Sequence, residues 1–181
     1  MTPDPAARDS ERQETLYGAA INEHGAALER LARSYEADPD KRQDLLQEIH
    51  LALWRSFRMF DDRCSLRTWV FRVGHNVAAT HIVKQRRTLA RLVGLDAVPE
   101  IRSDADMEDA IDRRATLERL FTLIHQLGLI DRQVVLLYLE DHDAATIGEI
   151  TGLSAGNVAT KISRLKKVLG QRANLGGFHA R

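Results

Sequence analysis

The sequence predicts an all-α protein built from two small helical domains joined by a linker. The first indication is composition, because the 181 residues include only four prolines and 11 glycines and a chain rich in Leu, Ala and Arg favours helices. The second is that apolar residues recur at helical spacing along most of the chain, whereas no long segment alternates with the period of a strand. The third is the stretch 93–112, where acidic residues, Gly and Pro gather without clean periodicity, as is typical of a linker.

The N-terminal domain is expected to span residues 15–92. It follows residues 1–14, which we expect to form a flexible tail because they are small, charged and include two prolines. The first helix is predicted from Leu16 to Tyr35, where apolar residues recur at helical spacing until a proline-containing break. The second helix is predicted from Lys41 to Phe57. Its buried stripe is expected to consist of Leu45, Ile49, Ala52 and Leu53.

A third helix is predicted from Leu66 to Arg87, with Ser65 as its N-cap. Its core-facing row is expected to hold Leu66, Val70, Val73 and Val77. The residues expected to lie away from this row are Arg72, His75 and Asn76, with Trp69 at the edge. Arginine, asparagine and aromatic side chains together suit contacts to a nucleic-acid backbone and an unstacked base, although a lone tryptophan is more often part of a core. Gly74 in mid-helix costs about 1 kcal/mol relative to Ala, and the sequence shows no gain that offsets this cost.

The C-terminal domain is expected to span residues 113–172, before a flexible tail over residues 173–181. Helical patterns are found at residues 109–126, 131–139, 143–151 and 154–171. Asp143 is expected to cap the third of these helices. The last helix has two different faces, and its apolar row consists of Val158, Ile162, Leu165 and Leu169. Its opposite face carries Asn157, Thr160, Lys161, Arg164 and Lys167, and no acid.

The last two helices and the turn between them have the pattern of a helix-turn-helix. Gly152 suits the tight turn, Ser154 can cap the second helix, and Gly148 is expected where the two helices cross closely. A polar and basic second helix is the form that enters a DNA major groove, where Asn can recognise adenine and Arg or Lys guanine. The alternative is a plain αα-hairpin with a solvated outer face, but such faces usually mix both signs of charge.

Charge is distributed in blocks although the formal net charge is zero. From Lys41 to Arg91 there are eleven basic residues against four acids, and from Gly152 onward six basic residues and no acid. Acids fill the N-terminal arm and the segment from Asp96 to Glu118. Two basic modules with an acidic spacer indicate a polyanion that is bound at two places. Ordinary solvated faces remain the alternative if charge is considered alone.

Several classes of protein are disfavoured. The single cysteine, Cys64, excludes an internal disulfide and an all-cysteine metal site, so a reduced cytoplasm is the expected compartment. No apolar run approaches the roughly 20 residues of a membrane span, and the N-terminus has no secretory signal pattern. The common catalytic motifs are missing. The acidic and histidine-containing stretch 140–143 could suggest a metal, but Asp is frequent at such a helix boundary, and we expect no metal, cofactor or catalytic residue.

The two domains resemble a known family. DLLQE at 44–48, followed by LALWRSFRMFDD, SLRTWVFRVGHNVA and KQRR, resembles region 2 of bacterial sigma factors. LGLIDRQVVLLYLE and the helix-turn-helix after it resemble region 4. The lack of a domain between them is similar to the extracytoplasmic-function (ECF) group. The resemblance covers residues 16–171. Departures such as Thr80 where Asp is frequent, and Gly128 where Pro is frequent, bear on the promoter sequence rather than on the class.

This resemblance implies a non-catalytic transcription initiation factor that binds core RNA polymerase and directs it to promoter DNA. The expected contacts to the polymerase β′ clamp coiled coil and its surroundings are Asp44, Leu46, Gln47, Glu48 and Arg55. The residues expected to recognise and melt the −10 element are Arg63, Ser65, Arg67, Trp69, Arg72, His75, Asn76, Lys84, Arg86 and Arg87. Those expected to recognise the −35 element are Ser154, Asn157, Thr160, Lys161, Arg164 and Lys167, and region 4 would also contact the β flap.

The sequence also allows two other interpretations. A stand-alone helix-turn-helix repressor or activator explains the C-terminal domain but gives DLLQE and the aromatic, basic third helix no role. Such proteins usually dimerise, and the sequence shows no obvious dimerisation helix. An enzyme is disfavoured by the missing motifs. The sequence leaves open whether an anti-sigma factor also binds the chain.

Overall fold

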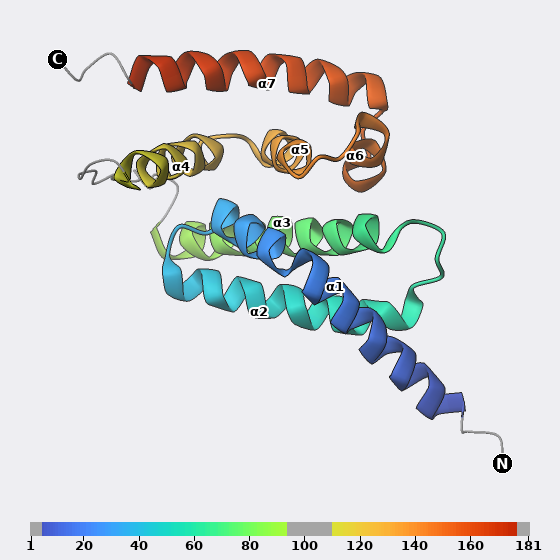
Figure 1. Ribbon diagram of the computed structural model, residues 1–181. Helices are drawn as coiled ribbons and strands as arrows, with labels where there is room; N and C mark the ends of the chain where they lie inside the picture. The colour runs from blue at the N-terminus through green and yellow to red at the C-terminus, as the bar shows by residue number, and fades with distance from the viewer. Residues whose placement is uncertain (1–4, 94–109, 177–181) are drawn as a thin grey trace. The chain divides into compact units, whose positions relative to one another are not determined.

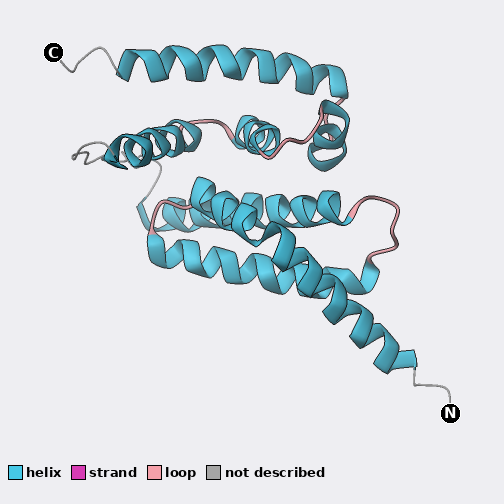
Figure 2. Ribbon diagram, in the orientation of Figure 1, coloured by secondary structure: helices cyan, strands magenta, loops and turns pink. Residues whose placement is uncertain are grey.

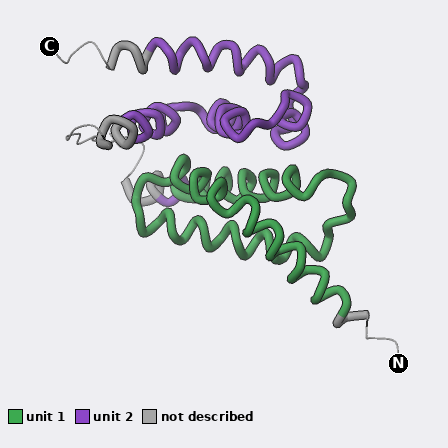
Figure 3. Tube along the Cα trace, in the orientation of Figure 1, with its two compact units in different colours: residues 1–85 green, residues 86–181 purple. Residues whose placement is uncertain are grey.

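The computed structural model describes residues 5–93 and 110–176, and the side chains of residues 8–88 and 116–171 (Figure 1). Over these residues the secondary structure is helical throughout, with short loops (Figure 2). The chain divides into two compact units, Met1–Gln85 and Arg86–Arg181 (Figure 3). The predicted all-α class with two helical domains is therefore confirmed. The predicted linker over residues 93–112 lies mostly outside the described residues.

Helix α1 (Pro5–Tyr35) begins earlier than the sequence predicts. The expectation of a flexible tail over residues 1–14 is wrong for residues 5–14, which are helical. The reason is tertiary packing, because the Gln13 side chain is only 3% exposed and its Nε2 donates to the Trp54 carbonyl oxygen at 2.5 Å. Proline is also compatible with the first turn of a helix.

Helix α2 (Pro39–Ser56) follows its predicted span closely. The carboxylate of Asp38 accepts from the backbone N–H groups of Asp40 and Lys41, and a proline lies in the first turn, so the start of the helix is fixed by local chemistry. The predicted stripe is confirmed at Leu45, Ile49 and Leu53, which are buried. A short 3-10 helix, η1 (Phe57–Met59), continues the chain.

Helix α3 (Leu66–Val93) starts where predicted, with Ser65 Oγ accepting from Thr68 N at 3.0 Å. Its buried face is rotated from the predicted one. Val70, Phe71, His75 and Ala78 are buried, whereas Leu66, Val73 and Val77 are only half-buried.

Gly74 explains this rotation. A Cβ at this position would lie 3.2 Å from Leu28 Cδ2, 3.5 Å from Leu31 Cδ1 and 3.9 Å from Ile49 Cγ2. Side chains of α1 and α2 therefore pack closely against α3 at the residue that has no side chain of its own. This close approach is the gain that offsets the low helix propensity of glycine. It also turns His75, the next residue, into the core.

The second unit contains α4 (Ala110–His125), α5 (Leu129–Leu139), α6 (Ala144–Thr151) and α7 (Ala155–Gly176). Helices α5, α6 and α7 pack on one another around Val134, Leu137, Ile147, Val158 and Leu165, which are buried. Helix α7 extends beyond residue 171, so the first part of the predicted tail over 173–181 is helical as well.

The turn between α6 and α7 has the geometry that the sequence predicts. Asp143 Oδ1 accepts from Thr146 N at 2.7 Å to cap α6, and Gly152 adopts the left-handed conformation with φ of 77°. A Cβ on Gly148 would lie 2.6 Å from the Leu153 carbonyl oxygen. Since no side chain fits at that distance, glycine is required at this helix crossing.

Candidate protein- and nucleic-acid-binding surfaces

One face of α2 points to solvent and carries a mixed set of side chains. Its exposed members are Asp44, Gln47, Glu48, Leu51 and Arg55, which follow the spacing of a single helix face. Four of them were predicted from the sequence. Leu51 was missed, although it is 49% exposed and lies one turn from both Gln47 and Arg55. Leu46, also predicted, is half-buried and lies beside this face.

Glu48 connects this face to α3. Its Oε2 lies 3.7 Å from His81 Nδ1, and the other ring nitrogen of His81 lies 3.5 Å from Glu36 Oε2. Glu36 is buried and also accepts a hydrogen bond from Gln85 Nε2. The histidine therefore stands between two carboxylates, one of which, Glu48, belongs to the exposed face of α2.

The loop between η1 and α3 is held by the first turns of α1. Arg12 donates from Nη1 to the Phe60 carbonyl oxygen at 3.1 Å and from Nη2 to Asp62 Oδ2 at 2.9 Å. Asp62 has a φ of 59°, in the left-handed region, so the loop turns sharply where Arg12 contacts it. Arg63, a predicted DNA contact, pairs with Asp61 at 2.9 Å. Sequence reasoning missed Arg12 because it lay in the predicted tail.

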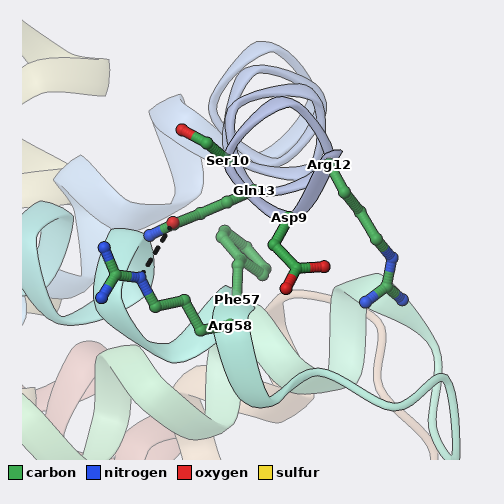
Figure 4. Close-up of a pocket in the computed structure, with 6 residues that line it drawn as sticks. All are labelled: Asp9, Ser10, Arg12, Gln13, Phe57 and Arg58. Atoms are coloured by element: carbon green, nitrogen blue, oxygen red, sulfur yellow. Dashed lines mark hydrogen bonds between the residues drawn. The ribbon is translucent and has the colours of Figure 1, made fainter. Parts of the chain in front are cut away.

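Figure 4 shows the pocket beside this contact. Arg58 Nε donates to Gln13 Oε1 at 3.1 Å across the junction of α1 and η1. The pocket is lined by Asp9, Ser10, Arg12, Gln13, Phe57 and Arg58. Charged residues of both signs line the pocket, and the Arg58–Gln13 hydrogen bond joins α1 to η1 beside it.

Helix α3 places its predicted DNA-contacting residues in different environments. Asn76 is exposed, as are Ser65, Lys84, Arg86 and Arg87, whereas Arg67, Trp69 and Arg72 are half-buried. The Trp69 indole N–H donates to Ser56 Oγ at 2.9 Å, and its ring packs against Phe60 at 5.3 Å between centroids. Trp69 is thus packed between α3 and the loop before it, and is not an isolated platform for base stacking.

His75 does not lie on the outer face of α3, where the sequence predicts it. It is 1% exposed and its Nδ1 lies 3.2 Å from the Tyr35 hydroxyl oxygen. The expectation that His75 lies on the outer face and contacts DNA is therefore wrong for this structure. The physical cause is the close approach at Gly74, which places the neighbouring histidine in the core.

The outer face of α7 presents the residues predicted for it. Ser154, Asn157, Thr160, Arg164 and Lys167 are exposed, and Lys161 is half-buried. Ser154 Oγ accepts from Asn157 N at 3.3 Å, so Ser154 caps the helix. The sequence predicts no acid on this face, and this prediction is wrong for the folded protein, because an acid from another helix lies there. Asp131 of α5 reaches it, with its Oδ1 2.6 Å from Lys161 Nζ and its Oδ2 2.6 Å from Arg164 Nη2.

Comparison with known families accounts for both units. The profile described as Sigma-70 region 2 matches residues 20–88, and the one described as Sigma-70, region 4 matches residues 117–169. The RNA polymerase sigma factor NccH of Alcaligenes xylosoxydans xylosoxydans is 24% identical over 170 residues, covering 91% of this chain and 90% of that protein. The ECF RNA polymerase sigma factor SigW of Bacillus subtilis (strain 168) is 28% identical over 138 residues, covering 70% and 72%.

The chain belongs to the ECF group of the sigma-70 family.

Solved structures show the same fold. A structure of CnrH in complex with the cytosolic domain of CnrY matches this sigma factor with a TM-score of 0.65 and 23% identity, covering 94% of this chain and 95% of that chain. A co-crystal structure of the sigma factor RpoE with the anti-sigma factor NepR from Bartonella quintana matches with a TM-score of 0.64 and 19% identity, covering 87% and 96%. The two-domain helical architecture is thus that of solved sigma factors.

The stretch 140–143 of this sigma factor serves helix boundaries. His142 is buried, and the hydrogen bond from Thr146 N that makes Asp143 the α6 cap also lowers the pKa of the Asp143 carboxyl. Within the described residues, no group of three or more His, Cys, Asp or Glu side chains is placed to hold a metal ion. In the same part of the chain, no helix is long and apolar enough to cross a membrane.

Proposed function

We propose that this sigma factor directs core RNA polymerase to promoters by dividing three contacts among α2, α3 and α7. Sigma factors are a non-enzymatic family that acts in transcription initiation. The observation that carries the assignment is that exposed, partner-suited faces of α2 and α7 occur in one chain, each backed by its own apolar core.

The exposed face of α2 is proposed to bind the polymerase, at the β′ clamp coiled coil. Leu51 supplies apolar area at the centre of the face, while Asp44, Glu48 and Arg55 surround it with charge. An apolar centre with a polar rim is the usual anatomy of a protein–protein interface. Leu46 and Gln47 complete the proposed contact set.

The loop before α3 and the outer side of α3 are proposed to recognise and melt the −10 element. The proposed contacts are Arg63, Ser65, Arg67, Trp69, Arg72, Asn76, Lys84, Arg86 and Arg87. Asn76 is exposed in mid-helix, and its amide has the donors and acceptor needed to bind the edge of an unpaired base. The arginines and lysine at the C-terminal end are suited to phosphates.

The outer face of α7 is proposed to bind the −35 element in duplex form. In a helix-turn-helix the second helix lies in the major groove and presents its N-terminal half to base edges. Asn157 and Thr160 lie in that half and are exposed, while Lys167 is exposed further along. Ser154, Lys161 and Arg164 complete the proposed set.

Bivalent binding suits the energetics of promoter opening. Unstacking a base step costs a few kcal/mol, and capture of an extruded base returns about 1–3 kcal/mol. Because polymerase holds both sigma domains, binding of the second DNA element becomes intramolecular and gains effective concentration. Each domain can therefore bind DNA weakly by itself.

The test is run-off transcription with bacterial core polymerase and this chain on a library of promoters. We expect initiation from defined start sites that depends on the added chain. Tight, specific binding to duplex DNA without polymerase, together with no initiation, would instead identify a stand-alone repressor.

The remaining assignments concern compartment and regulation. The proposed compartment is the bacterial cytoplasm, and its support is the proposed partner, core polymerase. An anti-sigma factor is a further candidate partner, because the solved RpoE structure contains the anti-sigma factor NepR. Co-purification with a tagged chain from its own cells tests both assignments.

A further inference from the structure

One acidic side chain is built into the proposed DNA-binding face of α7. Asp131 lies in the first turn of α5, and its side chain is 22% exposed. Each carboxylate oxygen accepts a hydrogen bond from one cation of α7: Oδ1 from Lys161 Nζ at 2.6 Å, and Oδ2 from Arg164 Nη2 at 2.6 Å. Charge-assisted hydrogen bonds of this length are among the stronger polar contacts in proteins.

This arrangement has two opposing effects on DNA binding. Lys161, Arg164 and Lys167 give the face three positive charges, and Asp131 offsets one of them. The weaker field reduces the sequence-independent attraction to phosphates, which grows with the number of cations that meet the backbone. The same carboxylate limits the conformations of two long, flexible side chains, so less entropy is lost when they contact specific base edges.

The chemistry of the two cations allows them to bind Asp131 and DNA together. An ammonium group has three N–H donors and a guanidinium has five, and Asp131 accepts one from each in this structure. The carboxylate therefore directs the two side chains without using up their donors.

We propose that Asp131 is a positioning residue that raises the sequence discrimination of the α7 face by holding Lys161 and Arg164 in place and lowering their attraction to DNA in general. This inference rests on the proposed function of α7. It assigns to a residue outside the helix-turn-helix a role in promoter selection.

The central experiment replaces Asp131 by its neutral isostere in the full chain. For Asp131→Asn we expect random-sequence duplex DNA to bind about three- to tenfold more tightly at low salt, with a slope of log K against log salt that is steeper by about one unit. With core polymerase, the ratio of initiation at the preferred promoter to initiation at promoters with an altered −35 element should fall. Fluorescence anisotropy on random duplex and run-off transcription measure the two effects.

Asp141→Asn is the matched control. It removes the same charge from the same unit at an exposed turn residue with a φ of 57°, a conformation that asparagine tolerates. We expect random-duplex affinity to change by less than about twofold, since none of the α7 cations whose side chains the structure describes pairs with Asp141. Equal increases in the two variants would mean a general effect of net charge and would overturn the proposal.

Two further variants separate positioning from folding. In an Lys161→Gln/Arg164→Gln background, adding Asp131→Asn should no longer change promoter discrimination, because the groups through which Asp131 acts are gone. Asp131→Glu keeps the charge and should retain random-duplex binding near the wild-type level.

Weaker binding to every DNA in Asp131→Asn, or its failure to fold while Asp131→Glu folds, would show a structural role and overturn the proposal. Absence of initiation by the wild-type chain would instead count against the proposed function.

Discussion

At the residue scale, Gly148 is a position where structure excludes every side chain. The Leu153 carbonyl oxygen lies 2.6 Å from where a Cβ would stand, and it belongs to the backbone of the tight turn. The turn has to open before even a methyl group fits. We expect Gly148→Ala to lower the free energy of unfolding by about 1–3 kcal/mol, measured by urea denaturation of the full chain.

The control for this prediction is the same substitution on the same structural unit. Gly170 in α7 has nothing within 4 Å of its virtual Cβ, so alanine there adds helix propensity without a clash. Gly170→Ala should raise the free energy of unfolding by about 0.5–1 kcal/mol. If both variants change stability in the same direction, the Gly148 interpretation fails.

His50 gives a prediction about pH. Burial lowers the pKa of His50 below its ordinary value of 6.5, against the opposing charge of Glu29, and its Nδ1 lies 2.9 Å from the Tyr17 hydroxyl oxygen. Below pH 6.5 the unfolded chain takes up a proton that the folded chain resists, so unfolding becomes easier as pH falls. The contribution of His50 to the free energy of unfolding is fully present above pH 6.5.

The measurement compares wild type with His50→Gln, because other histidines also titrate. We expect the free energy of unfolding of wild type to fall more steeply than that of His50→Gln between about pH 7.5 and about pH 5. Parallel curves for the two chains would refute this cause.

At the element scale, the exposed face of α2 predicts separate effects on binding and stability. Leu51 is 49% exposed, so Leu51→Ser removes apolar area from the proposed interface but little from the core. We expect about tenfold weaker binding to core polymerase with an unchanged thermal midpoint. Met59→Ser, at another exposed apolar residue of the same unit, is the control and should bind normally.

Helix α3 predicts a defect that depends on the state of the DNA. Asn76 is exposed, so Asn76→Ala should spare folding and core binding while impairing promoter opening. We expect run-off transcription to fall on duplex templates and to recover on templates with a preopened bubble. An equal defect on both templates would remove Asn76 from the melting step.

The sequence predicted elements better than it predicted the faces they bury. The predictions of helix α6 and of its turn into α7 were correct because Asp143, Gly152 and Ser154 shape the backbone of residues next to them in the sequence. The predicted buried face of α3 was wrong because a row of valines suggested the core. In the structure, α1 packs against α3 at Gly74, and His75 is buried. Asp131 was missed because it lies 30 and 33 residues from the cations it binds, a distance that no local pattern spans.

At the scale of the whole molecule, the two units should act together on one promoter. Asn157→Ala/Lys167→Ala changes only the proposed upstream contact. We expect about tenfold less initiation from a promoter with both elements, because one of two linked contacts is lost. On a promoter whose upstream element is scrambled, wild type and variant should be equal, as run-off transcription would show. A variant that is also impaired there would indicate damage outside the upstream contact.

The contact of Arg12 with the loop before α3 has a practical consequence for experiments on this protein. The match to region 2 begins at residue 20, yet Arg12 binds the Phe60 carbonyl oxygen and Asp62. Trimming the chain to the matched region would remove this support from the loop proposed to meet the −10 element. Expression designs that shorten or fuse the N-terminus can therefore change promoter choice while leaving every matched residue intact.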